Sequence, residues 1–210
     1  MRIGELSRAA GVPVPTIKYY LREGLLPQGE LSSPNQASYD EAHLRRLRLI
    51  RALVELAQVP VAQVKEILVA LDSDAVPLHE QIGRAHRALT PTRKPAATDE
   101  ARTAAAAQVT DLIARRGWSV ESTAPALATL IETVAALRTL GQDNLVSFLD
   151  AYAEAVEGFT ELEIAAVSTN PTRDQLAESV VIGTILGETL ISSLRLLAQE
   201  SISAKRWQQP

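Results

Sequence analysis

Apolar and polar residues alternate with the period of a helix in GVPVPTIKYYLREGLL, residues 11 to 26. The packed side of this short helix consists of Thr16, Ile17, Tyr20 and Leu21. The opposite side, which a partner can reach, consists of Lys18, Tyr19 and Arg22. Gly11 and Gly24 bound the helix, because a residue without Cβ most easily adopts the left-handed conformation that ends a helix.

The residues on either side predict the rest of a small domain. Residues 1 to 10 form a helix whose inward positions are Ile3, Leu6 and Ala10. A helix, a tight turn and a second helix with exposed cationic and phenolic groups are typical of a DNA-binding helix-turn-helix. Residues 25 to 40 are dense in Gly, Pro, Asn and Ser, which predicts a turn between two short extended pieces.

Two more helices complete this region. Asp40 caps the first, because its carboxylate accepts hydrogen bonds from free backbone N–H groups. From Glu41 to Ala57 the inward positions are Leu44, Leu47, either Ile50 or Arg51, and Val54, whereas Arg45, Arg46 and Arg48 are predicted to be exposed. After Pro60, the core positions are Val64, Ile67, Leu68 and Leu71, and Lys65 points outward.

Helical patterns continue to the end of the chain. Residues 76 to 89 predict a helix, after which Pro91 and Pro95 interrupt a continuous rod. Further helices are predicted at 99 to 116, 124 to 140, 143 to 157, 161 to 167 and 170 to 204. The helix at 143 to 157 has a predicted buried side of Leu145, Phe148, Leu149, Tyr152 and Val156. The last helix is apolar on nearly all sides, which predicts burial in a bundle or between subunits.

Composition supports a helical protein and limits its chemistry. Hydrophobic residues make up 46% of the 210 residues and aromatic residues only 4%, so the core is built mainly from good helix formers. The chain has no cysteine, which excludes disulfides and thiolate ligands and fits a cytoplasmic location. No charge-free apolar run reaches the roughly 18 to 20 residues of a membrane span, so no membrane partner is expected.

The charge is distributed unevenly. The net charge is −4, but residues 1 to 70 carry +2 and residues 71 to 210 carry −6. This asymmetry places a DNA contact in the first region. It also predicts only modest non-specific affinity, because few phosphates can be neutralised.

The run T-I-K-Y-Y-x-x-x-G-L-L resembles the recognition-helix signature of the MerR family of bacterial transcription regulators. IGELSRAAGV before it and SYDEAHLRRLRLIRAL after it stand where that family has its first helix and the helix after its first wing. The resemblance covers about residues 1 to 70. Lys18 stands where the family usually has Arg, and Pro13 and Pro15 replace more usual polar residues.

The resemblance implies a winged helix-turn-helix in which residues 25 to 40 form a β-hairpin wing. The implied DNA contacts are Val14, Thr16, Lys18, Tyr19, Tyr20, Arg22, Ser38, Tyr39, Arg45 and Lys65. Tyr20 is also a core candidate by its spacing. The wing is poor in Arg and Lys, which makes Ser38 and Tyr39 its expected donors.

We therefore predict a mostly α fold, with an N-terminal winged helix-turn-helix, a small hairpin wing and an all-α helical-bundle domain. The predicted ranges are residues 1 to 71 for DNA binding, 72 to 99 for a helical linker, and 100 to 210 for dimerisation and effector binding. The dimer interface is left open between the helix at 76 to 90 and the C-terminal bundle.

The C-terminal region offers weak site candidates. The aromatic residues available to line an effector pocket are Trp118, Phe148, Tyr152 and Phe159. Asp150, Glu154 and Glu157 either attract a cationic ligand or form a solvated face. His79 and His86 share a helix face, but two histidines alone are a weak metal signal.

No catalytic, metal or cofactor motif is present in the sequence, so no enzyme activity is expected. In the MerR family, metal sensing relies on cysteines, which argues against it here.

The function predicted from these observations is a homodimeric regulator. It would bind a pseudo-palindromic promoter operator beside RNA polymerase and respond to a small organic effector. By resemblance, such a protein bends and untwists promoter DNA when its effector binds. Two alternatives stay open: a C-terminal domain that only dimerises or binds a protein, and one that is a ligand-sequestering or enzymatic module recruited to DNA.

Overall fold

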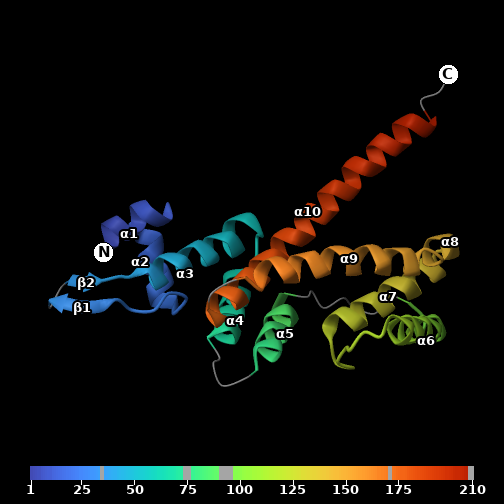
Figure 1. The fold of residues 1–210 in the computed structure, drawn as a ribbon, viewed down its shortest axis with the longest axis horizontal. Coiled ribbons are helices and arrows are strands. Elements are labelled where there is room, and N and C mark those ends of the chain that lie inside the picture. Colours follow the sequence, from blue (N-terminus) through green and yellow to red (C-terminus); the bar gives the residue numbers. More distant parts are fainter. Residues whose placement is uncertain (34–35, 73–76, 90–96, 170–171, 208–210) are drawn as a thin grey trace. The chain divides into compact units, whose positions relative to one another are not determined.

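The computed structural model describes residues 1–33, 36–72, 77–89, 97–169 and 172–207 (Figure 1). Contacts between residues divide the chain into two compact units. The first unit contains Met1–Ala85 and Asn170–Pro210, and the second contains His86–Thr169. The predicted fold class is confirmed: the chain is mostly helical, with a two-stranded antiparallel hairpin near its N-terminus.

The first unit begins with two short helices, α1 (Ile3–Ala10) and α2 (Val14–Glu23). The hairpin of β1 (Glu30–Ser33) and β2 (Gln36–Ser38) follows. Next come α3 (Glu41–Arg51), a π-helical turn η1 (Ala52–Leu56), α4 (Val61–Leu71) and the start of α5 (Leu78–Leu89). The unit is completed by α10 (Arg173–Trp207), the long red helix of Figure 1.

Local sequence signals set the helix boundaries as predicted. Gly11 and Gly24 end α1 and α2 with φ angles of 66° and 73°. Pro13 is the N-cap of α2, and Pro15 lies in its first turn, where a missing N–H breaks no helical hydrogen bond. Asp40 caps α3 by accepting a 3.0 Å hydrogen bond from the backbone N–H of His43.

The core of the first unit is dense. Its fully buried large side chains are Leu6, Ile17, Leu25, Leu26, Leu47, Leu49, Ile50, Leu53, Ile67 and Leu68. The start of α10 adds Ala177, Val180 and Val181, which are buried where this helix packs on η1 and α4. Residues 170 to 210 therefore cluster with the first unit, whereas the sequence grouped them with residues 100 to 169.

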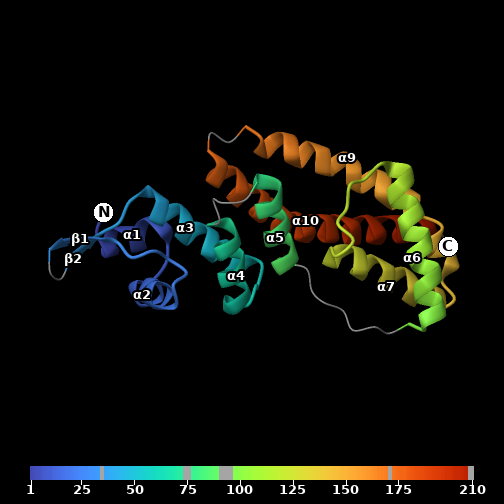
Figure 2. The same ribbon diagram turned by 90° about the horizontal axis from the view of Figure 1, so that it is seen from below.

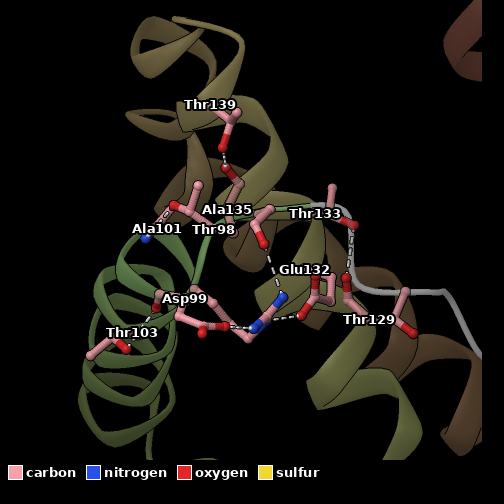
Figure 3. Close-up of polar contacts among 11 residues, drawn as sticks. Thr98, Asp99, Ala101, Thr103, Thr129, Glu132, Thr133, Ala135 and Thr139 are labelled. Atoms are coloured by element: carbon pink, nitrogen blue, oxygen red, sulfur yellow. Dashed lines mark hydrogen bonds and ion pairs between the residues drawn. The ribbon is translucent and has the colours of Figure 1, made fainter.

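The second unit is built around a helix pair, α6 (Asp99–Arg116) and α7 (Pro125–Thr139), which pack against each other (Figure 2). Its buried core consists of Ala105, Val109, Val134, Ala135 and Val146. Arg102 of α6 also ties the pair together, because its guanidinium donates to Glu132 of α7 and, at 2.6 Å, to Asp99 (Figure 3). These acceptors raise the pKa of Arg102, with the hydrogen bond that Arg102 donates to Glu132 as the largest cause.

The prediction for residues 143 to 167 is wrong in its boundaries. The chain forms a single turn α8 (Asp143–Val146) and then an unbroken helix α9 (Leu149–Val167). At the break, the Ser147 hydroxyl donates to the Asn144 carbonyl at 2.8 Å, a local bond that competes with helix continuation.

The predicted buried side of this segment is also largely exposed. Phe148, Tyr152 and Val156 are 53%, 47% and 44% exposed, and Ala153 is the buried residue of α9. Arginines of α6 hold α9 through its carboxylates: Arg115 donates to Asp150 at 3.0 Å and Arg116 to Glu157 at 3.4 Å. Ion pairs thus replace much of the apolar packing that the helical pattern predicted.

The two halves of α10 differ in exposure. Up to Gly187 its described side chains are mostly buried or half-buried, but from Glu188 onward nearly all are exposed. The exposed half carries Leu190, Leu194 and Leu197, each more than 60% exposed. By length and composition alone, Gln175–Trp207 is apolar enough to cross a membrane, although it contains Glu178, Glu188, Arg195, Glu200, Lys205 and Arg206. An apolar surface of this kind equally suits packing against a protein helix.

Candidate nucleic-acid interface

The exposed side of α2 presents two cations and a phenol ring. Lys18 and Arg22 are exposed and Tyr19 is half-buried. We call these three residues the α2 face. The Arg22 guanidinium carbon lies 5.4 Å from the centre of the Tyr19 ring, which is a cation–π distance. The α2 face therefore offers a guanidinium, an ammonium group and a phenol as hydrogen-bond donors on one side of the helix.

The opposite side of α2 is anchored in the core. Ile17 is fully buried and Tyr20 is only 4% exposed. Burial is the largest cause of the raised pKa of Tyr20, followed by the negative charge of Glu55. Tyr20 thus occupies the core position that its spacing predicted, with its ring centre 5.8 Å from that of Tyr19.

The turn between α1 and α2 is fixed by polar contacts. The Ser7 hydroxyl donates to the Val12 carbonyl at 2.7 Å, across the turn. Arg51, at the end of α3, donates to the Ala10 carbonyl at 3.4 Å and to Glu55 at 2.8 Å. A Cβ on Gly11 would lie 2.9 Å from the end of the flexible Arg51 side chain, which can shift, so the φ of 66° is what favours glycine here. These contacts orient α2 relative to α1 and α3.

The hairpin is joined to the first residue of the chain. The Met1 amino group donates to the Tyr39 carbonyl at 2.6 Å, and the Tyr39 N–H donates to the Met1 carbonyl at 2.8 Å. Ser38 is exposed, as the wing prediction requires. Tyr39, by contrast, is only 6% exposed, and its ring packs edge-on against His43 at 5.2 Å. Tyr39 therefore contributes to the base of the wing, which departs from its expected place as an exposed donor.

Asp40 and His43 lock the start of α3. The His43 ring nitrogen Nδ1 lies 2.6 Å from the Asp40 carboxylate and 3.3 Å from the Asp40 backbone nitrogen. The backbone and side-chain hydrogen bonds from His43 lower the pKa of Asp40 to about 2. The N-cap carboxylate consequently stays charged across the neutral range.

Arg46 is the residue that the sequence pattern misplaced. It was predicted to be exposed but is only 9% exposed. Its guanidinium donates to the Leu25 carbonyl at 3.2 Å and to both oxygens of Asp72, at 2.9 and 2.5 Å. Arg46 thereby links the end of the helix-turn-helix to α3 and to the end of α4. The helical spacing around Arg46 could not predict this burial, because the partner Asp72 lies 26 residues further along the chain.

The remaining predicted DNA contacts lie on several elements of the first unit. Val14 and Thr16 are half-buried in the first turn of α2. Arg45 on α3 and Lys65 on α4 are exposed. The structure thus gathers Val14, Thr16, Lys18, Tyr19 and Arg22 on one helix and leaves the two remaining cations available on others.

The predicted effector residues do not share one cavity. A groove with a volume of about 540 Å³ lies along α9 in the second unit, and we call it the α9 groove. Its lining residues are Trp118, Val156, Glu157, Thr160, Glu161, Ile164 and Ala165. Trp118 is thus the one predicted effector residue in this lining. Phe148 and Tyr152 are exposed elsewhere, and Phe159 is half-buried.

The histidine pair receives no support as a metal site. The side chain of His79 lies outside the described residues, and burial lowers the pKa of His86. Within the described ranges, no group of three or more His, Asp or Glu side chains is placed to hold a metal ion.

Helix, tight turn, exposed second helix and hairpin together define a winged helix-turn-helix protein. The model of the MerR HTH family of regulatory proteins matches residues 1–71. A solved structure, that of the proposed transcriptional regulator SCO5550 from Streptomyces coelicolor A3(2), is similar over the whole chain. It is 33% identical, with a TM-score of 0.80, and the match covers 100% of this chain and 99% of that one. Residues 1–71 of this chain therefore belong to the MerR HTH family, and the chain as a whole is similar to a transcriptional regulator.

Curated relatives match the N-terminal region. The HTH-type transcriptional regulator ZntR homolog of Haemophilus influenzae is 38% identical over 68 residues, which are 32% of this chain and 50% of that protein. The mercuric resistance operon regulatory protein of Bacillus cereus is 34% identical over 73 residues, which are 35% of this chain and 54% of that protein. The chain therefore spans about half the length of these two relatives.

Proposed function

We propose that this chain is a sequence-specific DNA-binding transcription regulator that acts as a homodimer. The observation that carries the proposal is the α2 face: Lys18 and Arg22 are exposed on a helix whose other side is fixed in the core. A helix held in this way can enter the major groove, where Lys and Arg donate to guanine and Tyr donates to phosphate or base. The family membership of residues 1–71 supports the same contact.

The wing and the neighbouring helices would add contacts to the phosphate backbone. Ser38, Arg45 and Lys65 are exposed on the hairpin, α3 and α4. Such contacts set the position of the protein on the duplex and carry no base specificity. We assign Tyr20 and Tyr39 to positioning, because both side chains are buried.

The homodimer is supported by the exposed half of α10. Leu190, Leu194 and Leu197 recur at intervals of four and three residues, which is the spacing of a helix–helix contact. Each is at least 62% exposed within one chain. Covering such side chains with a second copy removes apolar surface from water at roughly 25 cal/mol per Å². We therefore place the dimer interface on α10.

A two-fold dimer implies a pseudo-palindromic operator at a promoter, where RNA polymerase is the partner. We further propose a cytoplasmic location and control by a small organic effector, for which the α9 groove offers a volume in the range of ligand sites.

Selection of DNA from a randomised duplex pool tests the proposal. The full-length protein should enrich two inverted half-sites, with a central spacing that is the same in all selected sequences. A matched selection with Lys18→Ala should lose the preference within the half-sites. Enrichment of no sequence, or of single half-sites by a protein that sediments as a monomer, would contradict the proposed function.

A further inference from the structure

The α9 groove combines an indole ring with carboxylates on a helix that has no basic residue. Five acidic residues and no Lys or Arg occur between Leu149 and Val167. Four of the five, Asp150, Glu154, Glu157 and Glu161, follow one another at intervals of four, three and four residues. They therefore form one stripe along the helix.

Two arginines of α6 pair with the other three carboxylates of this stripe. Arg115 pairs with Asp150 at 3.0 Å, and Arg116 lies 3.4 Å from Glu157 and 3.9 Å from Glu154. Arg116 is the last residue of α6, which Gly117 terminates, so α6 supplies no further arginine beyond this point. Among the residues that the structure describes, Glu161 has neither an ion pair nor a hydrogen-bond partner. Glu161, at the end of the stripe that lies in the groove, is thus the one carboxylate of these four without an arginine partner in the described structure.

The rest of the groove suits an apolar body. The Trp118 indole N–H donates to the Glu157 carboxylate at 3.0 Å, which fixes the ring beside α9. Val156, Ile164 and Ala165 supply apolar surface on the same side of the helix. Trp is the side chain that attracts cations most strongly through its ring face, and apolar surroundings strengthen that attraction.

We propose that the α9 groove binds an organic cation with an aromatic body, with the cationic centre at Glu161 and the aromatic body against Trp118. The volume of about 540 Å³ fits a molecule of two or three rings. A simple metal cation would gain nothing from the apolar wall, and an organic anion would meet Glu161 and the remainder of the acidic helix. As the effector class of a regulator, this inference rests on the proposed function, but binding to the groove can be measured without DNA.

Tryptophan fluorescence tests the site directly. Trp207→Phe in the full-length chain removes the other tryptophan, which is 75% exposed at the end of α10, and leaves Trp118 as the reporter. Titration with 1-methyl-4-phenylpyridinium should quench or shift Trp118 emission at saturating concentration. Biphenyl-4-carboxylate, an anion of similar size, should bind at least about tenfold more weakly, because its charge is opposite.

Two substitutions of equal charge separate the groove from general attraction. Glu161→Gln should raise the Kd for the cation about fivefold, the size expected for an exposed charge pair. Glu163→Gln removes the same charge from the same helix but lies outside the groove lining, so the Kd should be unchanged. Equal effects of the two variants, or equal binding of cation and anion, would overturn the proposal.

The same samples distinguish the site from the proposed function. Operator affinity, measured by fluorescence anisotropy with and without the cation, should change with the cation and should do so less in Glu161→Gln. If the operator binds but Trp118 does not respond to the cation, the inference fails while the regulator stands. If Trp118 emission changes only with protein concentration, a second copy fills the groove, and the inference also fails. If the cation binds but the protein has no operator, the proposed function fails and the groove remains a cation site.

Discussion

Residues 1 to 71 and the region from residue 99 onward bury their large apolar side chains to very different extents. Of the eleven largest fully buried side chains, ten lie in the first region and only Leu112 lies in the second. Among the residues whose burial the structure describes, exposed large apolar side chains show the reverse: Leu31, Leu56 and Val69 lie in the first region and all the others from Val120 onward. The first region therefore completes its core within one chain, whereas the second retains apolar surface that another molecule can cover.

This difference matches the two tasks that we assign to the regions. A recognition helix needs a rigid support, because donors misplaced by a fraction of an ångström lose their geometry with base edges. A dimer interface or an effector site needs surface that is not yet buried. The dense core under α2 thus suits DNA recognition, and the exposed leucines of α10 suit association with a second chain.

The largest expected effect contrasts a core leucine with an exposed one. Leu47→Ala, at a fully buried position, should lower the free energy of unfolding by about 2–5 kcal/mol. Leu194→Ala, at a position that is 62% exposed, should change the free energy of unfolding of the monomeric chain by less than about 0.5 kcal/mol. Urea unfolding at low protein concentration measures both. Similar losses of unfolding free energy in the two variants would contradict the difference in burial between the two regions.

The exposed leucines should matter to association. Leu194→Glu would place a charge in the proposed α10 interface and should weaken dimerisation by about 3 kcal/mol, because an unpaired buried charge is costly. Sedimentation equilibrium gives the association constant. Leu31→Glu, at an exposed hairpin position, is the matched control and should leave the dimer intact. A dimer that tolerates Leu194→Glu would move the interface away from α10.

The buried guanidinium of Arg46 should contribute less to the free energy of unfolding than a buried core leucine does. Arg46→Met keeps most of the side-chain volume but removes the bonds to Leu25 and Asp72, and should cost about 1–2 kcal/mol of unfolding free energy. The neighbouring Arg45→Met, at an exposed position, should cost less than about 0.5 kcal/mol. A double-mutant cycle with Asp72→Asn would isolate the pair, and a coupling of zero would show that the bidentate contact adds nothing.

The smallest effect concerns the cap of α3. Asp40→Ala should cost about 1 kcal/mol, whereas Asp40→Asn should keep most of the cap. The folded protein holds the pKa of Asp40 at about 2, below its ordinary value of 3.8. The stabilisation is therefore complete above pH 4 and is lost as the pH falls towards 2. Acid titration of the unfolding free energy should be flatter for Asp40→Asn than for the parent, and identical curves would contradict the assignment.

The sequence predicted correctly those features that depend on residues close to one another in the chain. The spacing around Ile17 and Tyr20, the left-handed glycines and the Asp40 cap each depend on neighbours within a few residues, and the structure confirms them. The hairpin was also predicted, through turn composition and the family resemblance.

The misplaced features depend on partners distant in sequence. Arg46 is buried because Asp72, 26 residues away, meets it. Tyr152 is exposed, and the contacts of α9 with α6 include the ion pairs of Arg115 and Arg116 with residues far along the chain. The π-helical turn η1 and the left-handed Gln58 after it, with φ of 56°, follow a helical pattern that gives no sign of either. The break at Pro91 and Pro95 lies outside the described residues and stays a prediction.

The affinity of α2 variants for the selected operator tests the central claim most directly. Lys18→Ala and Tyr19→Ala should each weaken binding by about 1–3 kcal/mol, as loss of a base or phosphate contact does, without lowering the unfolding free energy by more than about 0.5 kcal/mol. Lys205→Ala, which removes the same charge from the last turn of α10, is the control and should bind as the parent does. Unchanged operator affinity for both α2 variants, in protein that remains folded and dimeric, would contradict the account.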